Sequence, residues 1–167
     1  MRAPVLAVLA VLLASEAQAF DVDRCGLVVP TGEVGHVVSD LSCPASLEAA
    51  VYLDPSATLS LGGHRILGDG GGEFGIACLG SCTVTGPGEI GAFKACITAS
   101  YARRATAHDL EVHHCETGIL APDIRATNVF AHHHEKWAFG VLKRMKGVGL
   151  TADDNGLHGF FGPKLVL

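Results

Sequence analysis

The sequence has few aromatic and few charged residues, and it lacks an apolar run long enough to cross a bilayer. Aromatic side chains make up 6% and charged side chains 17% of its 167 residues. Its clearest apolar run, from Val5 to Leu13, is much shorter than the roughly 20 residues that a transmembrane helix needs. The net charge of -5 argues against the basic surface typical of nucleic-acid-binding domains. We therefore expect neither a membrane span nor a nucleic-acid partner.

The N-terminus has the pattern of an export signal. Arg2 precedes the apolar run, and the small residues Ala17 and Ala19 flank Gln18 at its end. A basic start, a short apolar core and a small-x-small site are typical of a cleaved secretory signal. We predict that residues 1–19 are a signal peptide and that the protein is secreted, either periplasmic or extracellular.

All six cysteines follow that segment. An even number of cysteines in an exported chain predicts disulfides, because the compartment is oxidising. Cys25 with Cys43 and Cys78 with Cys82 are the nearest pairs in sequence, but spacing alone leaves the pairing open. The candidates are Cys25, Cys43, Cys78, Cys82, Cys96 and Cys115.

Most of the chain carries a weak internal repeat of about 22 residues, in which a small residue precedes an aliphatic or aromatic one. Within each unit, apolar residues alternate with polar or small ones, which indicates strands. A repeat of this length predicts a solenoid, whose coils bury their apolar side chains by stacking on one another. The anchors of the repeat, expected to form one interior column, are Val51, Ile76, Ile97, Ile119, Val141 and Phe160.

The block LSLGGHRILG and several Gly-aliphatic pairs resemble the secreted β-helix repeat proteins of the pectate-lyase-like superfamily. The pairs are Gly75-Ile76, Gly118-Ile119, Gly140-Val141 and Gly159-Phe160. The resemblance implies an all-β, right-handed parallel β-helix, and we expect about five coils from a repeat of this length. Members of the superfamily include polysaccharide lyases, glycoside hydrolases, uronan epimerases, phage spikes and proteins without known activity. Fold likeness alone therefore does not select a function.

The repeat also suggests how the mature chain is divided. We expect residues 20–49 to form an N-terminal cap, since the end of a parallel stack exposes unpaired backbone groups. Residues 50–167 are expected to form the coils. The chain ends in the apolar segment PKLVL, so we expect further coils or another subunit to cover that end.

Seven of the nine histidines lie between His108 and His158. Adjacent strands lie about 4.8 Å apart, so alignment of the strand ends predicts that His113, His132 and Asp153 stack on one another. The residues after them, His114, His133 and Asp154, form a second predicted stack. Imidazole and carboxylate together suit a divalent transition metal, and we assign a candidate metal site to His113, His132 and Asp153. A hydrogen-bonded ladder without metal is the alternative.

Carbohydrate binding or processing is the function we expect first, in the manner of a polysaccharide lyase or hydrolase. Asp153, Asp154 and His133 are the candidate catalytic residues, because paired carboxylates and a histidine supply acid and base groups. Candidate substrate-binding residues are Arg125 and Arg144, which offer positive charge, and Trp137, which offers a stacking surface. Two alternatives stay open, a non-catalytic structural or surface-interaction β-helix and a metal-binding protein.

Overall fold

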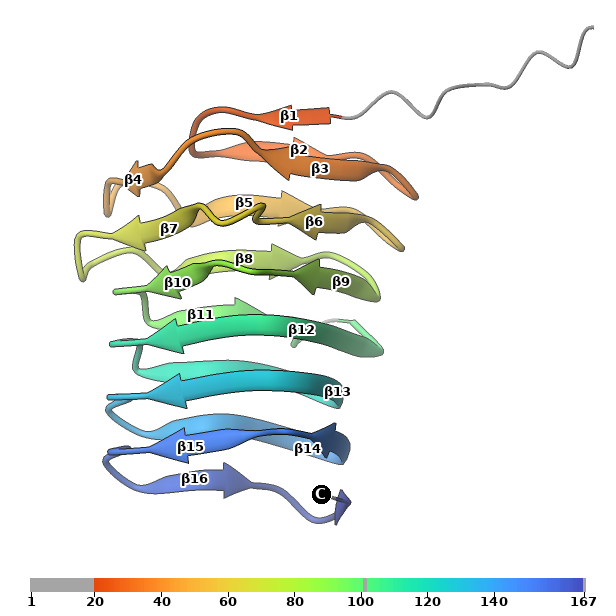
Figure 1. Cartoon of the computed structure of the whole chain (residues 1–167), viewed down its shortest axis with the longest axis vertical. Helices are drawn as coiled ribbons and strands as arrows, with labels where there is room; N and C mark the ends of the chain where they lie inside the picture. The colour runs from red at the N-terminus through yellow and green to blue at the C-terminus, as the bar shows by residue number, and fades with distance from the viewer. Residues whose placement is uncertain (1–19, 101, 167) are drawn as a thin grey trace, which may run out of the picture.

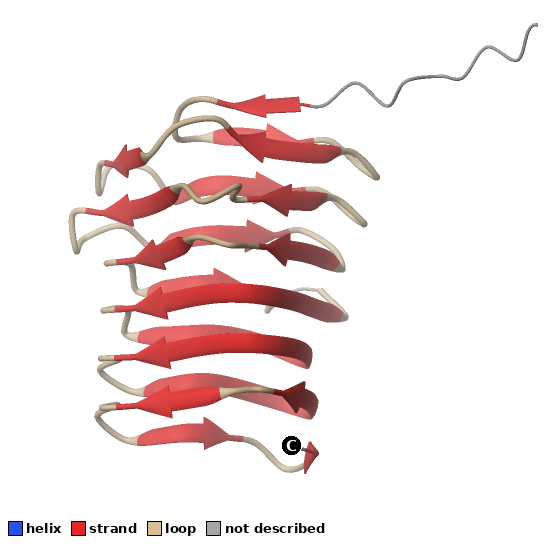
Figure 2. Ribbon diagram, viewed as in Figure 1, coloured by secondary structure: helices blue, strands red, loops and turns tan. Residues whose placement is uncertain are grey.

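The computed structural model describes residues 20–100 and 102–166 as one right-handed parallel β-solenoid. Its coils are stacked along the long axis, with the first strand at one end and the last at the other (Figure 1). The described residues form strands and connecting loops, with no helix among them (Figure 2). A membrane-spanning helix is accordingly not found in this part of the chain. The predicted signal peptide, residues 1–19, lies outside the described residues.

The strands build three faces of one continuous parallel sheet. Face 1 contains β2 (Leu27–Val29), β5 (Ala49–Leu53), β8 (Phe74–Cys78), β11 (Ala95–Thr98), the starts of β13 (Thr117–His132) and β14 (Trp137–Val148), and β16 (His158–Phe161). Face 2 contains β1 (Phe20–Val22), β3 (Val34–Val37), β6 (Thr58–Ser60), β9 (Cys82–Thr85), the start of β12 (Arg104–His113), later parts of β13 and β14, and β17 (Leu165–Val166). Face 3 contains β4 (Leu41–Cys43), β7 (Arg65–Gly68), β10 (Glu89–Gly91), the ends of β12 and β13, and β15 (Thr151–Asp153).

The solenoid has about seven coils rather than the five we expected. The difference arises at the N-terminus, in the segment predicted to be a cap. Strands β1 to β4 of that segment pair in parallel with β3, β5, β6 and β7, so they continue the three faces. The first coils therefore have the same sheet architecture as the rest.

The interior of face 1 is a continuous apolar column, as the repeat predicted. Its members pair in register from coil to coil, and those from Val51 to Phe139 are almost fully buried. One anchor was wrong, because Ile119 pairs with Phe139, whereas Val141 pairs with Ala121. The observed column is Val51, Ile76, Ile97, Ile119, Phe139 and Phe160.

A shorter coil explains the misplaced anchor, which lies two residues beyond the true partner Phe139. In the preceding coil a connection separates β11, which ends at Thr98, from β12, which begins at Arg104. Strand β13 instead passes from face 1 to face 2 without such a connection. A constant repeat length therefore places the next anchor too late.

All six cysteines are paired, which confirms the disulfide prediction. The bonds join Cys25 to Cys43, Cys78 to Cys82, and Cys96 to Cys115, with Cα–Cα distances of 5.7, 5.9 and 5.8 Å. These distances are typical of disulfides. The third bond links face 1 to the corner that follows face 3, beside the histidine-rich region.

Candidate functional site

The outer surface of face 3 carries two columns of polar and aromatic side chains. His113, His132 and Asp153 pair in register, which confirms the predicted stacking. The position before His113 in this column is Gly91, where a Cβ would lie only 2.6 Å from Cε1 of His113, so glycine leaves room for the ring. The neighbouring column consists of Arg65, Glu89, Glu111, Phe130 and Thr151.

The chain turns sharply at the residue after each of these positions. His114, His133 and Asp154 have φ angles of 51°, 55° and 47°, a left-handed conformation in which Asp and His are enriched among non-glycine residues. Because the corners repeat, the rings of His114 and His133 are parallel, with centroids 5.0 Å apart and planes at 1°. The second predicted stack therefore also forms at its histidine positions.

The left-handed turn brings the two histidines of each coil together at their Nδ1 atoms. These atoms are 2.9 Å apart between His113 and His114, and 2.5 Å apart between His132 and His133. Between coils the rings stack instead, as those of His113 and His132 do with centroids 5.5 Å apart. The direct contacts between histidine nitrogens thus lie within a coil.

Carboxylates contact the opposite nitrogen of three of these rings. Nε2 of His132 is 2.8 Å from Oε1 of Glu111, and Nε2 of His133 is 3.0 Å from Oδ2 of Asp154. Nε2 of His113 lies 3.8 Å from Glu89. The pKa of His113 is lowered chiefly by burial, with the nearby His114 adding to the effect. The face therefore combines imidazole rings with carboxylates at hydrogen-bond distance from two of them.

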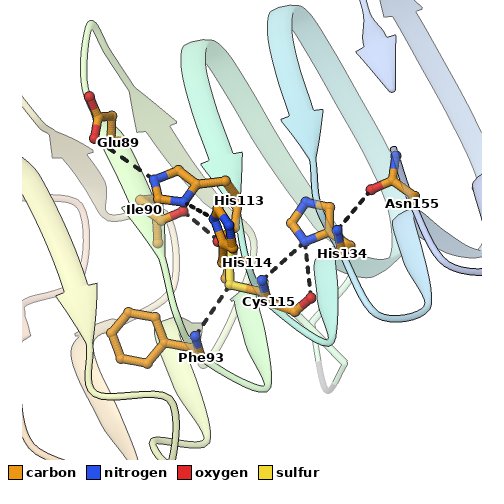
Figure 3. The surroundings of a disulfide bond; sticks show 9 residues. Glu89, Ile90, Phe93, His113, His114, Cys115, His134 and Asn155 are labelled. Carbon is orange, nitrogen blue, oxygen red and sulfur yellow. Dashed lines mark hydrogen bonds and ion pairs between the residues drawn. A yellow bond between two sulfur atoms is a disulfide. The ribbon is translucent and has the colours of Figure 1, made fainter. Parts of the chain in front are cut away.

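A separate ladder of side chains points into the solenoid at the same corner (Figure 3). The backbone amide of each member contacts the side chain of the next coil: Phe93 N donates to Sγ of Cys115, and His134 N donates to Oδ1 of Asn155, at 3.4 and 3.1 Å. Nδ1 of His134 lies 3.3 Å from the amide nitrogen of Cys115 and 3.2 Å from its carbonyl oxygen. This ladder satisfies backbone groups at a buried corner.

His134 is the buried member of the consecutive histidine run and is only 2% exposed. Burial lowers its pKa to about 4. Its Nε2 atom has no hydrogen-bond partner among the described residues, and a Cβ at Gly118 would lie 2.7 Å from it. His134 thus has a structural position, which our sequence analysis did not assign to it.

Within the described residues, one group of three potential ligand atoms lies within 4.8 Å of one another: Cys96, Cys115 and His134. The two sulfur atoms are joined in a disulfide, so neither is a thiolate that could bind a metal. The predicted set of His113, His132 and Asp153 does not form such a compact group. Metal binding by that set stays a prediction.

The candidate catalytic residues lie at the end of face 3 and at the corner after it. Asp154 and His133 are in contact there, and Asp153 follows His132 in the outer column. Both aspartates are exposed. The arrangement can orient an imidazole by a carboxylate, which is one element of acid–base catalysis. Turnover by these residues stays a prediction.

The candidate substrate-binding residues lie on two faces of the solenoid. Arg125 lies on face 2 and lines a hollow of about 450 Å³ together with Lys146 and His108. Arg144 lies on the same face but forms an ion pair of 3.3 Å with Asp123. Trp137 lies on face 1, where its ring stacks on that of Phe161 with centroids 4.8 Å apart.

Some residues that contribute to these surfaces were missed in our sequence analysis. Glu111 contacts His132, and Phe130 stacks on the same ring with centroids 4.4 Å apart. The signal that would have found them is strand alternation, since Glu111 and His113, like Phe130 and His132, are two residues apart and share one side of a strand.

Comparison with known proteins identifies neither a family nor a function for the chain. No family model matches the chain, and no significant match was found among curated proteins or among solved structures. The fold and the geometry of its surfaces are therefore the basis for a functional proposal.

Proposed function

We propose that this protein is a secreted β-helix of the pectate-lyase-like kind that binds an acidic extracellular polysaccharide through face 2. The observation that carries the proposal is the register of Arg125 with Lys146 in adjacent coils, where both exposed side chains line one hollow. Successive strands lie about 4.8 Å apart, so the two cations are presented at consecutive coils along the solenoid axis.

The local charge favours an anionic ligand. Neither Arg125 nor Lys146 forms an ion pair with another residue in the described part of the chain, although the protein as a whole carries a net charge of -5. Next to them, Asp123 is partnered by Arg144. The two free cations are thus available to carboxylates of a bound uronate chain.

The same hollow offers neutral hydrogen-bonding groups. Thr106 pairs in register with Arg125, and His108 pairs with Thr127, so hydroxyl and imidazole groups alternate with the cations on this face. Hydroxyl groups of a sugar are both donors and acceptors and match such a surface. A rigid sheet also holds these groups in place before binding, which lowers the entropic cost of association.

Secretion is part of the proposal. Three disulfides are expected in a protein that folds in an oxidising compartment. The export pattern of residues 1–19 supports the same interpretation. Extracellular polysaccharides are ligands that a secreted protein would meet.

The test is binding of the purified protein to polygalacturonate and alginate, with neutral dextran as comparison, by calorimetry. We expect binding to the two uronates, weakened at about 0.5 M NaCl because salt screens charge interactions. Replacing Arg125 and Lys146 together by Ala should weaken uronate binding about tenfold.

A matched control removes two cations elsewhere. Lys94 and Lys136 are exposed and pair with Glu73 and Glu116, so their double replacement by Ala changes the net charge equally. This control should retain binding. Equal binding by the Arg125/Lys146 variant and the original protein, or equal binding to dextran and uronates, would refute the proposal.

Cleavage of the polysaccharide is not included in the proposal. The candidate catalytic residues Asp154 and His133 lie at the corner after face 3, whereas Arg125 lies on face 2. A ligand held in the face 2 hollow is therefore bound by a different surface from the one that carries those residues. Binding is the function that the geometry supports best.

A further inference from the structure

We propose that the paired histidines at the end of face 3 chelate a divalent transition-metal ion, with His132 and His133 as the principal ligands through their Nδ1 atoms. The proposal is independent of carbohydrate binding and uses a different surface. It also differs from a site built across coils, because both principal ligands come from one coil.

Both rings contact a carboxylate through their Nε2 atoms. Nε2 of His132 lies 2.8 Å from Glu111 and Nε2 of His133 lies 3.0 Å from Asp154. A carboxylate is an acceptor, so each Nε2 atom donates its proton to the carboxylate beside it. In the form that binds a metal ion, the lone pairs are therefore on the two Nδ1 atoms.

The two Nδ1 atoms lie close together. The Nδ1 atoms of His132 and His133 are 2.5 Å apart. Two lone pairs at this distance repel each other unless a proton or a metal ion is shared between the two nitrogens. A divalent metal ion bound to both nitrogens removes the repulsion and uses both lone pairs.

The spacing of the Nδ1 atoms is close to that of two ligands on one metal ion. Imidazole nitrogen binds zinc at about 2.0–2.1 Å, which places two ligands of one ion about 2.9 Å apart at a right angle and about 3.3 Å apart at the tetrahedral angle. The His113–His114 pair, at 2.9 Å, has the first spacing. The His132–His133 pair reaches it through a small rotation of His133, which is the exposed ring of the two.

The surroundings match those of metal-bound histidines. In such sites the second ring nitrogen almost always donates to a carboxylate, carbonyl or water, which fixes the tautomer and the ring orientation. Glu111 and Asp154 make these contacts here, and Phe130 stacks on His132 with centroids 4.4 Å apart. Asp153, in register with His132, adds negative charge on the next coil.

The His113–His114 pair repeats the arrangement one coil earlier in a weaker form. Its only carboxylate contact among the described residues joins His113 to Glu89 at 3.8 Å. We therefore expect the tighter binding at His132 and His133. Paired imidazoles with oxygen groups nearby suit Cu²⁺ and Zn²⁺, and Cu²⁺ should bind more tightly than Zn²⁺.

The experiment is calorimetric titration of the chelator-stripped protein with CuCl₂ and with ZnCl₂, together with electron paramagnetic resonance of the Cu²⁺ form. We expect nitrogen coupling in the spectrum and a rise of the melting temperature on adding metal. Replacing His132 and His133 by Ala should weaken the tightest binding step by at least tenfold. Replacing Glu111 by Gln and Asp154 by Asn should weaken it about 10- to 100-fold with the ligands still present.

The matched control replaces His36 and His158, two exposed histidines outside the pairs, by Ala. It should bind metal as the original protein does. Replacing His113 and His114 should cause a smaller loss than replacing His132 and His133. The proposal is overturned if the His132/His133 variant, folded by circular dichroism, binds Cu²⁺ as tightly as the original. It is also overturned if the spectrum of the Cu²⁺ form shows no nitrogen coupling, in which case the rings only share protons in a polar ladder.

Discussion

Nδ1 of His134 lies 3.3 Å from the amide nitrogen of Cys115, the residue that occupies the same corner one coil earlier. This contact makes a titratable side chain part of the interior. Asn155 occupies the corresponding position one coil later and accepts a hydrogen bond from the amide of His134. Asparagine is therefore a residue that this corner already accommodates.

We expect His134 to make the fold sensitive to acid. Burial lowers its pKa to about 4, against about 6.5 in an unfolded chain, so the unfolded state binds the proton more readily between these values. The stability that neutral His134 contributes is complete above about pH 6.5 and is lost as the pH falls toward 4, by about 3 kcal/mol in total. Urea unfolding at a series of pH values measures this loss.

The variant His134→Asn is the comparison for that experiment. It removes the titratable group and keeps a side chain that can accept from the amide of Cys115. As the pH falls from about 6.5 to 4, the unfolding free energy of the original protein should decrease relative to that of the variant. Parallel stability curves from pH 7 to pH 4 would show that His134 is not the acid-sensitive group.

The interior column of face 1 should be sensitive to loss of volume. Ile97 is 1% exposed between Ile76 and Ile119, so Ile97→Ala should lower the unfolding free energy by about 2–5 kcal/mol. Leu142, which is 56% exposed, is the control, and Leu142→Ala should change stability by less than about 0.5 kcal/mol. Similar losses for the two variants in denaturant unfolding would contradict the assigned column.

The disulfides should differ in their contribution to stability according to the loops that they close. Cys96 and Cys115 are 19 residues apart, whereas Cys78 and Cys82 are 4 apart. By chain entropy, replacing the first pair by Ala should cost about 3 kcal/mol and replacing the second about 2 kcal/mol. Thermal and denaturant unfolding of the two variants give the comparison. A larger loss of stability on removing the bond of the shorter loop would show that chain entropy does not explain the difference.

Asn128 should tolerate glycine better than alanine. Its φ is 53°, and its side chain donates a hydrogen bond of 2.9 Å to Asp109. Asn128→Ala removes this bond and leaves alanine in a left-handed conformation. That conformation costs an alanine residue about 1–2 kcal/mol, because its Cβ atom approaches the following carbonyl oxygen. Asn128→Gly also removes the bond, but glycine adopts the left-handed conformation without this penalty. The glycine variant should therefore unfold at a higher denaturant concentration than the alanine variant. The reverse order would show that the conformation is not the deciding factor.

The repeat in the sequence predicted most of the fold, because an interior column requires apolar residues at near-constant spacing. Val51, Ile76, Ile97 and Ile119 follow that spacing and pair as expected. Phe139 was missed because β13 passes from face 1 to face 2 without the connection that separates β11 from β12, and a constant period does not show which coil is shorter.

The candidate site was predicted in part for the same reason. His113, His132 and Asp153 were expected to stack, because each follows a strand whose end is marked by alternation. The contacts of His132 with Glu111 and of His133 with Asp154 depend on side-chain rotamers and on the left-handed corner, which strand alternation does not determine. The predicted binding residues Arg125 and Trp137 proved to lie on different faces, since residue type alone does not assign a position to a face.

The order of hydrophobic and polar residues was enough to determine that this chain forms a parallel solenoid. It also determined that histidines of consecutive coils stack, because both features follow from one repeated distance along the chain. Only the tertiary structure decided which cysteines pair, which histidine of the run is buried, and which two imidazoles meet. Those outcomes depend on how the backbone turns at each corner. A turn of one residue into the left-handed region changes the direction of its side chain while leaving the repeat length unaltered.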